Sequence, residues 1–139
     1  MANASAISLS YLCEAIGINS LDPITPTILM DKFQISLEEA HKFFNKMEGP
    51  NSQKTTQKVL EKYVYSDKNH TFMNSVFNGF QGKVISENEF VNRWASSAGP
   101  IEMDMLKILF DECDKKLDGH ITREEFLTIG VNSDDSIEV

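Results

Sequence analysis

The sequence predicts an all-α protein built from repeated helix–loop–helix units. Apolar residues recur at helical spacing in several segments, for example through 101–113. Three segments, which begin at Ile35, Ile85 and Ile121, share the pattern Ile, Ser or Thr, two further residues and Glu. In a Ser/Thr-x-x-Glu motif the hydroxyl accepts from the N3 amide and the Glu carboxylate accepts from the N-cap amide, which starts a helix. Such capping boxes also begin many ordinary helices, so one copy alone would not identify a repeat.

Proline and glycine divide the chain into these elements. Pro23 and Pro26 exclude a helix interior after the first helix, and Gly49 ends the helix that follows the first capping box. Pro100 can open a helix because the N1 amide has no intrahelical partner. The expected helices lie, in chain order, at 6–17, 37–47, 59–65, 71–80, 87–97, 101–113 and 123–130, and 28–33 is expected to form only a short apolar element.

Composition bounds the class of protein. The chain has 139 residues, with 21 acidic against 13 basic side chains and a net charge of −8. This charge repels phosphate backbones and anionic membranes, so no nucleic-acid partner is expected. No apolar run is long enough to span a membrane, and the first residues lack the basic start of a signal peptide. We expect a soluble cytoplasmic protein, in which Cys13 and Cys113 are reduced thiols.

The stretch 114–125, DKKLDGHITREE, has the spacing of a calcium-binding loop. A hard cation needs several converging oxygen ligands, and such a loop supplies them by wrapping its side chains and one carbonyl around the ion. Gly119, at position 6, permits the sharp turn. The candidate metal ligands are the carboxylates of Asp114, Asp118 and Glu125, the backbone carbonyl of His120, and the hydroxyl of Thr122 or a water that it holds.

Lys116 departs from this pattern, because position 3 usually carries Asp or Asn. The lysine removes a ligand and brings an ammonium group toward a divalent cation, although its long stem can carry the charge into water. We therefore expect a single, weakened calcium site. The corresponding stretches counted back from Glu39 and Glu89, at 28–39 and 78–89, do not offer two carboxylates at ligand spacing and are expected to bind no calcium.

The spacing of the motifs predicts how the units pair. Neighbouring loops of this kind can join through their apolar eighth residues in a short antiparallel bridge. Ile85 and Ile121 are 36 residues apart, whereas Ile35 and Ile85 are 50 apart, so the second and third motifs are expected to pair. The expected organisation is a degenerate N-terminal lobe at 1–50, a linking helix at 51–70, a paired lobe at 71–130 and an acidic tail at 131–139.

The loop and its flanking helices, over about residues 101–130, resemble the EF-hand superfamily. The wider arrangement is similar to a shortened form of the sarcoplasmic calcium-binding proteins and calexcitin, including the aromatic-rich stretch VISENEFVNRW at 84–94. This resemblance implies an all-helical fold of EF-hand-like repeats and calcium as the cofactor. It also implies either calcium buffering or calcium-dependent binding of a partner.

The leading functional hypothesis is an EF-hand-type sensor or adaptor that binds a protein or peptide partner through its helical apolar surface. Six Met and nine Phe could line an adaptable groove, but the same residues would equally build a core. Two alternatives remain open, namely a calcium-independent carrier of a small apolar ligand and a calcium buffer. An enzyme is not expected, because the sequence has no GxSxG, GxxxxGKS/T or HExxH motif and its three histidines are isolated.

Overall fold

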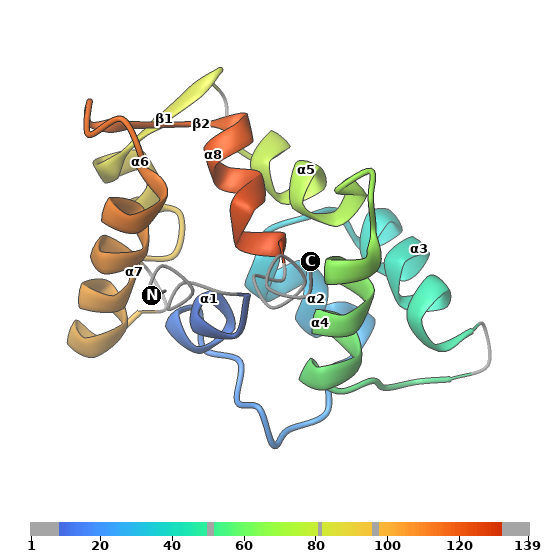
Figure 1. Ribbon diagram of the computed structural model, residues 1–139. Helices are drawn as coiled ribbons and strands as arrows, with labels where there is room; N and C mark the ends of the chain where they lie inside the picture. The colour runs from blue at the N-terminus through green and yellow to red at the C-terminus, as the bar shows by residue number, and fades with distance from the viewer. Residues whose placement is uncertain (1–8, 50–51, 81, 96–97, 132–139) are drawn as a thin grey trace, which may run out of the picture.

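The computed structural model describes residues 9–49, 52–80, 82–95 and 98–131, and it confirms a mostly helical protein. Within these residues it has eight α-helices, one two-stranded sheet and a short 3-10 helix (Figure 1). The elements are α1 (Leu9–Ala15), α2 (Pro26–Phe33), α3 (Leu37–Glu48), α4 (Gln57–Ser66), α5 (Thr71–Asn78), β1 (Val84–Ser86), α6 (Glu87–Asn92), α7 (Pro100–Cys113), β2 (His120–Thr122), α8 (Arg123–Leu127) and η3 (Thr128–Gly130). No described helix is both long and apolar enough to cross a membrane.

Side-chain capping sets the start of every second helix. The N-cap residues of α2, α4, α6 and α8 all have extended backbone, and each side chain accepts a hydrogen bond from the amide three residues on. The predicted capping boxes are complete at α6 and α8, where Glu89 and Glu125 also accept from the N-cap amides. At α3, Ser36 caps the amide of Glu39. The four N-caps of the first group are Thr25, Thr56, Ser86 and Thr122.

The predicted bridge between the second and third motifs is confirmed. Strands β1 and β2 pair antiparallel with Ile85 directly opposite Ile121, and both isoleucines have 0% exposure. Each strand is three residues long and leads directly into a helix, α6 from β1 and α8 from β2. This small sheet therefore fixes two helix starts next to each other, with one buried side chain from each strand in the core.

A second antiparallel bridge joins Ile24 to Thr55, and no sequence motif predicted it. The amide of Ile24 donates to the Thr55 carbonyl over 2.8 Å, and the amide of Thr55 donates back over 2.7 Å. Both residues directly precede N-caps, of α2 and α4. The connections that carry this bridge lie at the end of the molecule opposite the β1–β2 sheet (Figure 1).

The two bridges join consecutive pairs of helices. They divide the described helices into consecutive pairs, α1–α2, α3–α4, α5–α6 and α7–α8, with one bridge joining the first two pairs and one joining the last two. The segment 51–70, expected as a linking helix, contains α4, which directly follows a bridge residue as α6 and α8 do. Ile35, which begins the first of the three sequence motifs, lies in the short connection between α2 and α3.

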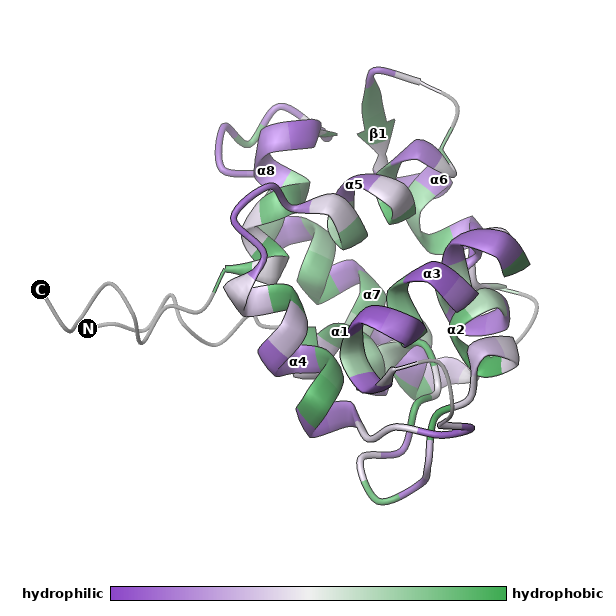
Figure 2. Cartoon of the chain, turned by 90° about the vertical axis from the view of Figure 1, so that its right-hand side faces the viewer, coloured by the Kyte–Doolittle hydropathy of each residue, from purple (hydrophilic) through white to green (hydrophobic). Residues whose placement is uncertain are grey.

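The core runs through all of these helix pairs. One buried apolar cluster takes side chains from α1 through η3, and the apolar positions face inward in Figure 2. α1, which comes first in the chain, packs against α7, so the two halves share this core. Aromatic rings concentrate where α5, α6 and α8 meet, with ring centroids between 5.5 and 6.5 Å apart among Phe77, Phe80, Phe90, Trp94 and Phe126.

Candidate functional site

The predicted calcium loop connects α7 to β2 and α8. α7 ends at Cys113, and Asp114 is its C-cap residue. The chain then turns through Leu117 and Gly119, whose φ angles are +55° and +84°. Gly119 adopts this left-handed conformation without steric cost, as its position in the motif predicted, whereas Leu117 is a large residue in a sparsely populated region. The side chain of Leu117 is 82% exposed.

Asp114 holds the first half of the loop together. The residue is 5% exposed, and its carboxylate accepts two backbone hydrogen bonds, from the amide of Gly119 at 2.8 Å and from the amide of Asp118 at 3.3 Å. Both donors follow Asp114 closely in sequence, so the carboxylate occupies the inside of the turn. This arrangement satisfies two amides of the tight turn that would otherwise have no partner.

Glu125 closes the loop from the other end. The residue is 8% exposed, and its carboxylate accepts from the amide of Thr122 at 2.8 Å and from the amide of Lys115 at 3.1 Å. The first bond completes the capping box of α8, and Thr122 returns it by accepting from the Glu125 amide at 3.2 Å. The second bond reaches back to the residue next to Asp114. Glu125, the last residue of the loop, is thus hydrogen-bonded to the backbone next to Asp114, the first residue.

The other predicted ligands are placed differently. Asp118 accepts from the amide of His120 at 3.1 Å, so one of its oxygens is used in a local turn. His120 is an exposed residue of β2, and its ring Nδ1 lies 3.3 Å from the backbone oxygen of Asp118. Lys116, at the position that departs from the motif, is exposed.

The loop provides some of the features of a calcium site but not a complete set of converging ligands. The carboxylates of Asp114 and Glu125 accept from backbone amides of the loop, whereas Asp118 accepts from the amide of His120. Among the described residues, no group of three or more His, Cys, Asp or Glu side chains is placed to hold a metal ion. Calcium binding here would require Asp118, the carbonyl of His120 and the Thr122 hydroxyl to join the two inward carboxylates.

The two stretches expected to bind no calcium have no open loop of this kind where they are described. In 28–39, all of 28–33 belongs to α2, and 37–39 form the start of α3. In 78–89 the chain passes from the end of α5 into β1 and α6, and residue 81 lies outside the described part. The expectation of no calcium there stays a prediction.

Two features outside the loop were not found from the sequence. The first is an exposed apolar row on α7, where Ile101 is 72% and Ile108 is 51% exposed and Met105 is half-buried between them. The second is a polar cleft beside α1 that contains the buried side chain of Gln57. The α7 row has a signal in the sequence, since its residues fall at i, i+4 and i+7, whereas the cleft has none.

Comparison with known proteins gives no relative. No protein-family model matches the chain, and neither a curated protein nor a solved structure matches it significantly. The resemblance of 101–130 to the EF-hand superfamily therefore stays a prediction from the motif.

Proposed function

We propose that this chain is an EF-hand-type binding protein without enzymatic activity. It carries one weak calcium site at 114–125 and binds a protein or peptide partner along α7. The observation that supports this most is the pairing of Ile85 with Ile121 beside a loop that turns two carboxylates inward. Paired helix–loop–helix units with acidic loop residues are suited to binding a hard cation between helices.

The calcium ligands in this proposal are Asp114, Asp118 and Glu125 through carboxylate oxygens, His120 through its carbonyl and Thr122 through its hydroxyl. Calcium would supply positive charge at the centre of the loop. Weak affinity follows from two observations. Lys116 contributes no oxygen at its position, and the carboxylates of Asp114, Asp118 and Glu125 already accept backbone hydrogen bonds that an ion would have to share or displace.

The partner surface in this proposal is the row Ile101, Met105 and Ile108 on α7. These side chains lie on one side of the helix, as i, i+4 and i+7 positions do. Exposed acidic residues lie on the same helix, at Asp104 and at 111–112. An apolar row beside acidic side chains complements an amphipathic helix whose polar face is basic.

The test is peptide binding measured by fluorescence anisotropy. The probe is a labelled amphipathic peptide of Leu and Lys, titrated with the full chain in millimolar calcium and in chelator. Binding is expected in both conditions because the α7 row is exposed and includes no residue of loop 114–125. Ile101→Ser with Ile108→Ser should weaken binding by about 10-fold or more.

The matched control is Leu21→Ser. Leu21 is 89% exposed and lies in the loop before α2, away from α7. It removes an exposed apolar side chain without touching the row and should leave the affinity unchanged. Equal weakening by both changes, or no binding by the unmodified chain, would count against α7 as the partner surface. Calcium titration by calorimetry tests the metal part separately.

A further inference from the structure

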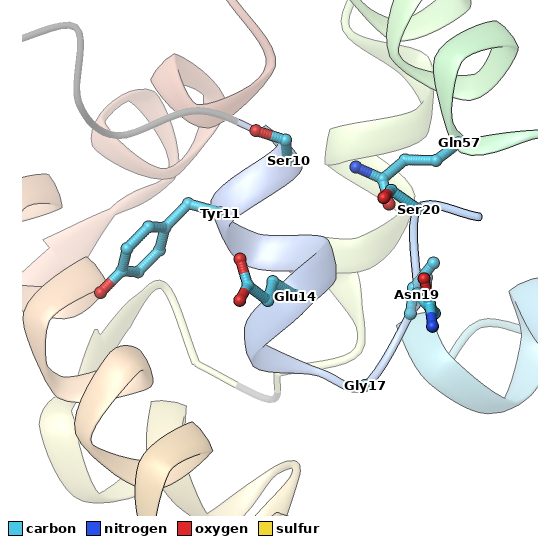
Figure 3. A pocket seen from close by; sticks show the side chains of 8 residues that line it. Ser10, Tyr11, Glu14, Gly17, Asn19, Ser20 and Gln57 are labelled. Atoms are coloured by element: carbon cyan, nitrogen blue, oxygen red, sulfur yellow. The ribbon is translucent and has the colours of Figure 1, made fainter. Parts of the chain in front are cut away.

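A polar cleft of about 650 Å³ lies between α1, the loop that follows it and the start of α4 (Figure 3). Its polar lining includes Glu14 on α1, Asn19 and Ser20 on the loop, and Gln57 on α4. Figure 3 shows the Gln57 side chain reaching from α4 toward α1 and Ser20. The cleft is remote in sequence from loop 114–125 and from the α7 row.

Gln57 is the unusual member of this lining. It is only 7% exposed, and its Oε1 has no hydrogen-bond partner. The orientation of the amide follows from its other end, because Nε2 donates to Oε2 of Glu61 over 2.7 Å. Turning the amide over would place Oε1 against a carboxylate that cannot donate. A buried carbonyl oxygen without a donor lowers the stability of the fold, so Oε1 of Gln57 is an acceptor that a bound donor could satisfy.

The charged side chains nearest to this acceptor are acidic, because Glu14 lines the cleft and Glu61 accepts from Nε2 of Gln57. Burial raises the pKa of Tyr11, and the nearby carboxylate of Glu14 raises it further. Burial likewise raises the pKa of Cys13, with a further contribution from Glu61. None of the described residues that line the cleft is basic. Lys32 lines a smaller neighbouring cleft of about 210 Å³.

We propose that this cleft binds a small organic cation with an ammonium or guanidinium group, whose N–H donors go to the Glu14 carboxylate and to Oε1 of Gln57. Glu14 is exposed and can receive the cation first. Oε1 is buried, so this binding mode requires a side-chain movement that opens Oε1 to the cleft. None of the residues that line this cleft belongs to loop 114–125 or to the α7 row.

The experiment is calorimetric titration of the full chain with putrescine at physiological ionic strength, which screens long-range attraction to the acidic surface. The diol of the same length is the neutral comparison. Gln57→Met removes the acceptor with little change in size, and Glu14→Gln removes the charge. Each should weaken putrescine binding by about 10-fold, and the diol should not bind.

The control for general attraction is Glu38→Gln, which removes the same charge from an exposed position on α3. It should leave the affinity unchanged. Equal weakening by Glu38→Gln and Glu14→Gln, equal binding of diol and diamine, or no binding of putrescine would each overturn the proposal. Circular dichroism checks that Gln57→Met folds. If Gln57→Met does not fold, Gln57→Glu is measured in its place. A carboxylate at position 57 should tighten putrescine binding, and an unchanged affinity would overturn the proposal.

Discussion

Trp94 donates its indole N–H to the carbonyl oxygen of Lys32 over 2.7 Å, so a residue that follows α6 satisfies a carbonyl in the last turn of α2. Arg93 extends the same contact, because its Nη2 lies 3.0 Å from the carbonyl oxygens of both Phe33 and Gln34. The last carbonyls of a helix have no intrahelical donor, and a cation is favourable at this end of the helix dipole. Burial lowers the pKa of Arg93 to about 10, which leaves it charged at neutral pH.

Trp94→Phe should destabilise the fold by about 1–3 kcal/mol, because Phe keeps much of the ring packing but leaves the buried Lys32 carbonyl without its donor. Urea unfolding followed by far-ultraviolet circular dichroism measures this, since Trp94 is the only tryptophan and its fluorescence is lost. Leu21→Ala, at an exposed position, should change the stability by less than about 0.5 kcal/mol. A Trp94→Phe variant as stable as this control would show that the hydrogen bond contributes nothing.

Gly79→Ala should also destabilise the fold, and the effect should depend on Arg93. A Cβ at position 79 would lie 2.2 Å from Nη2 and 2.7 Å from Cζ of Arg93. The guanidinium cannot easily move away, because it donates to three backbone carbonyls, of Val76, Phe33 and Gln34. We expect a loss of about 1–3 kcal/mol in the native background and a clearly smaller loss in an Arg93→Ala background. Additive losses in this double-mutant cycle would rule out the steric cause.

Lys116→Asp should raise the calcium affinity by at least about 10-fold, equal to about 1.4 kcal/mol, because it adds an oxygen ligand and removes a positive charge from the loop. Lys115→Asp is the matched control, since it makes the same charge change at a position that supplies no side-chain ligand. It should give a smaller gain. Glu125→Gln in the Lys116→Asp background should reverse most of the gain. An affinity that stays the same after Lys116→Asp would mean that the loop cannot adopt the ligand geometry.

The capping box of α6 should contribute stability that depends on pH. Glu89 accepts from the Ser86 amide at 2.8 Å, and this hydrogen bond is the main cause of a lowered pKa, followed by the Ser86 hydroxyl. Folding therefore favours the ionised carboxylate. The stabilisation should be fully present above the ordinary pKa of 4.5 and should be lost as the pH falls below it through the lowered value.

Thermal unfolding of Glu89→Gln against the native chain checks this. The difference in Tm should be largest near pH 7 and should shrink toward about pH 3. Glu87→Gln removes a carboxylate from the same turn that takes no part in the capping box, so its effect should be smaller. A difference in Tm for Glu89→Gln that is constant over this range would contradict the assignment.

The sequence predicted the second half of the fold well because its signals there are local. The capping boxes at Ser86 and Thr122 name their own partners three residues away, and Ile85 and Ile121 precede them at the same offset. The position of Gly119 in the motif likewise predicted the left-handed turn. Such features depend on a few neighbouring residues, so a single sequence is enough to find them.

The first half was harder because its signals misled. Thr25 and Thr56 are N-caps, but the N3 positions that follow them hold Ile28 and Val59 rather than Glu. Neither therefore forms the Ser/Thr-x-x-Glu pattern. Ser36 does form this pattern, but it is the N-cap of α3, which does not follow a described bridge. The contact of Arg93 with the end of α2 spans about 60 residues and has no local pattern. Gln57 was unpredictable for the same reason, since only the fold buries it.

The hydrogen bond from the Lys115 amide to Glu125 also lowers the conformational entropy that the loop would lose if an ion bound there. It joins residues 10 apart and, with the two bonds to Asp114, restricts the backbone of 114–125. An ion arriving there would order few further residues. Its effect on the rest of the chain would then come through neutralised charge rather than through a change of shape, and amide exchange at Lys115 and Gly119 should be slow before any calcium is added.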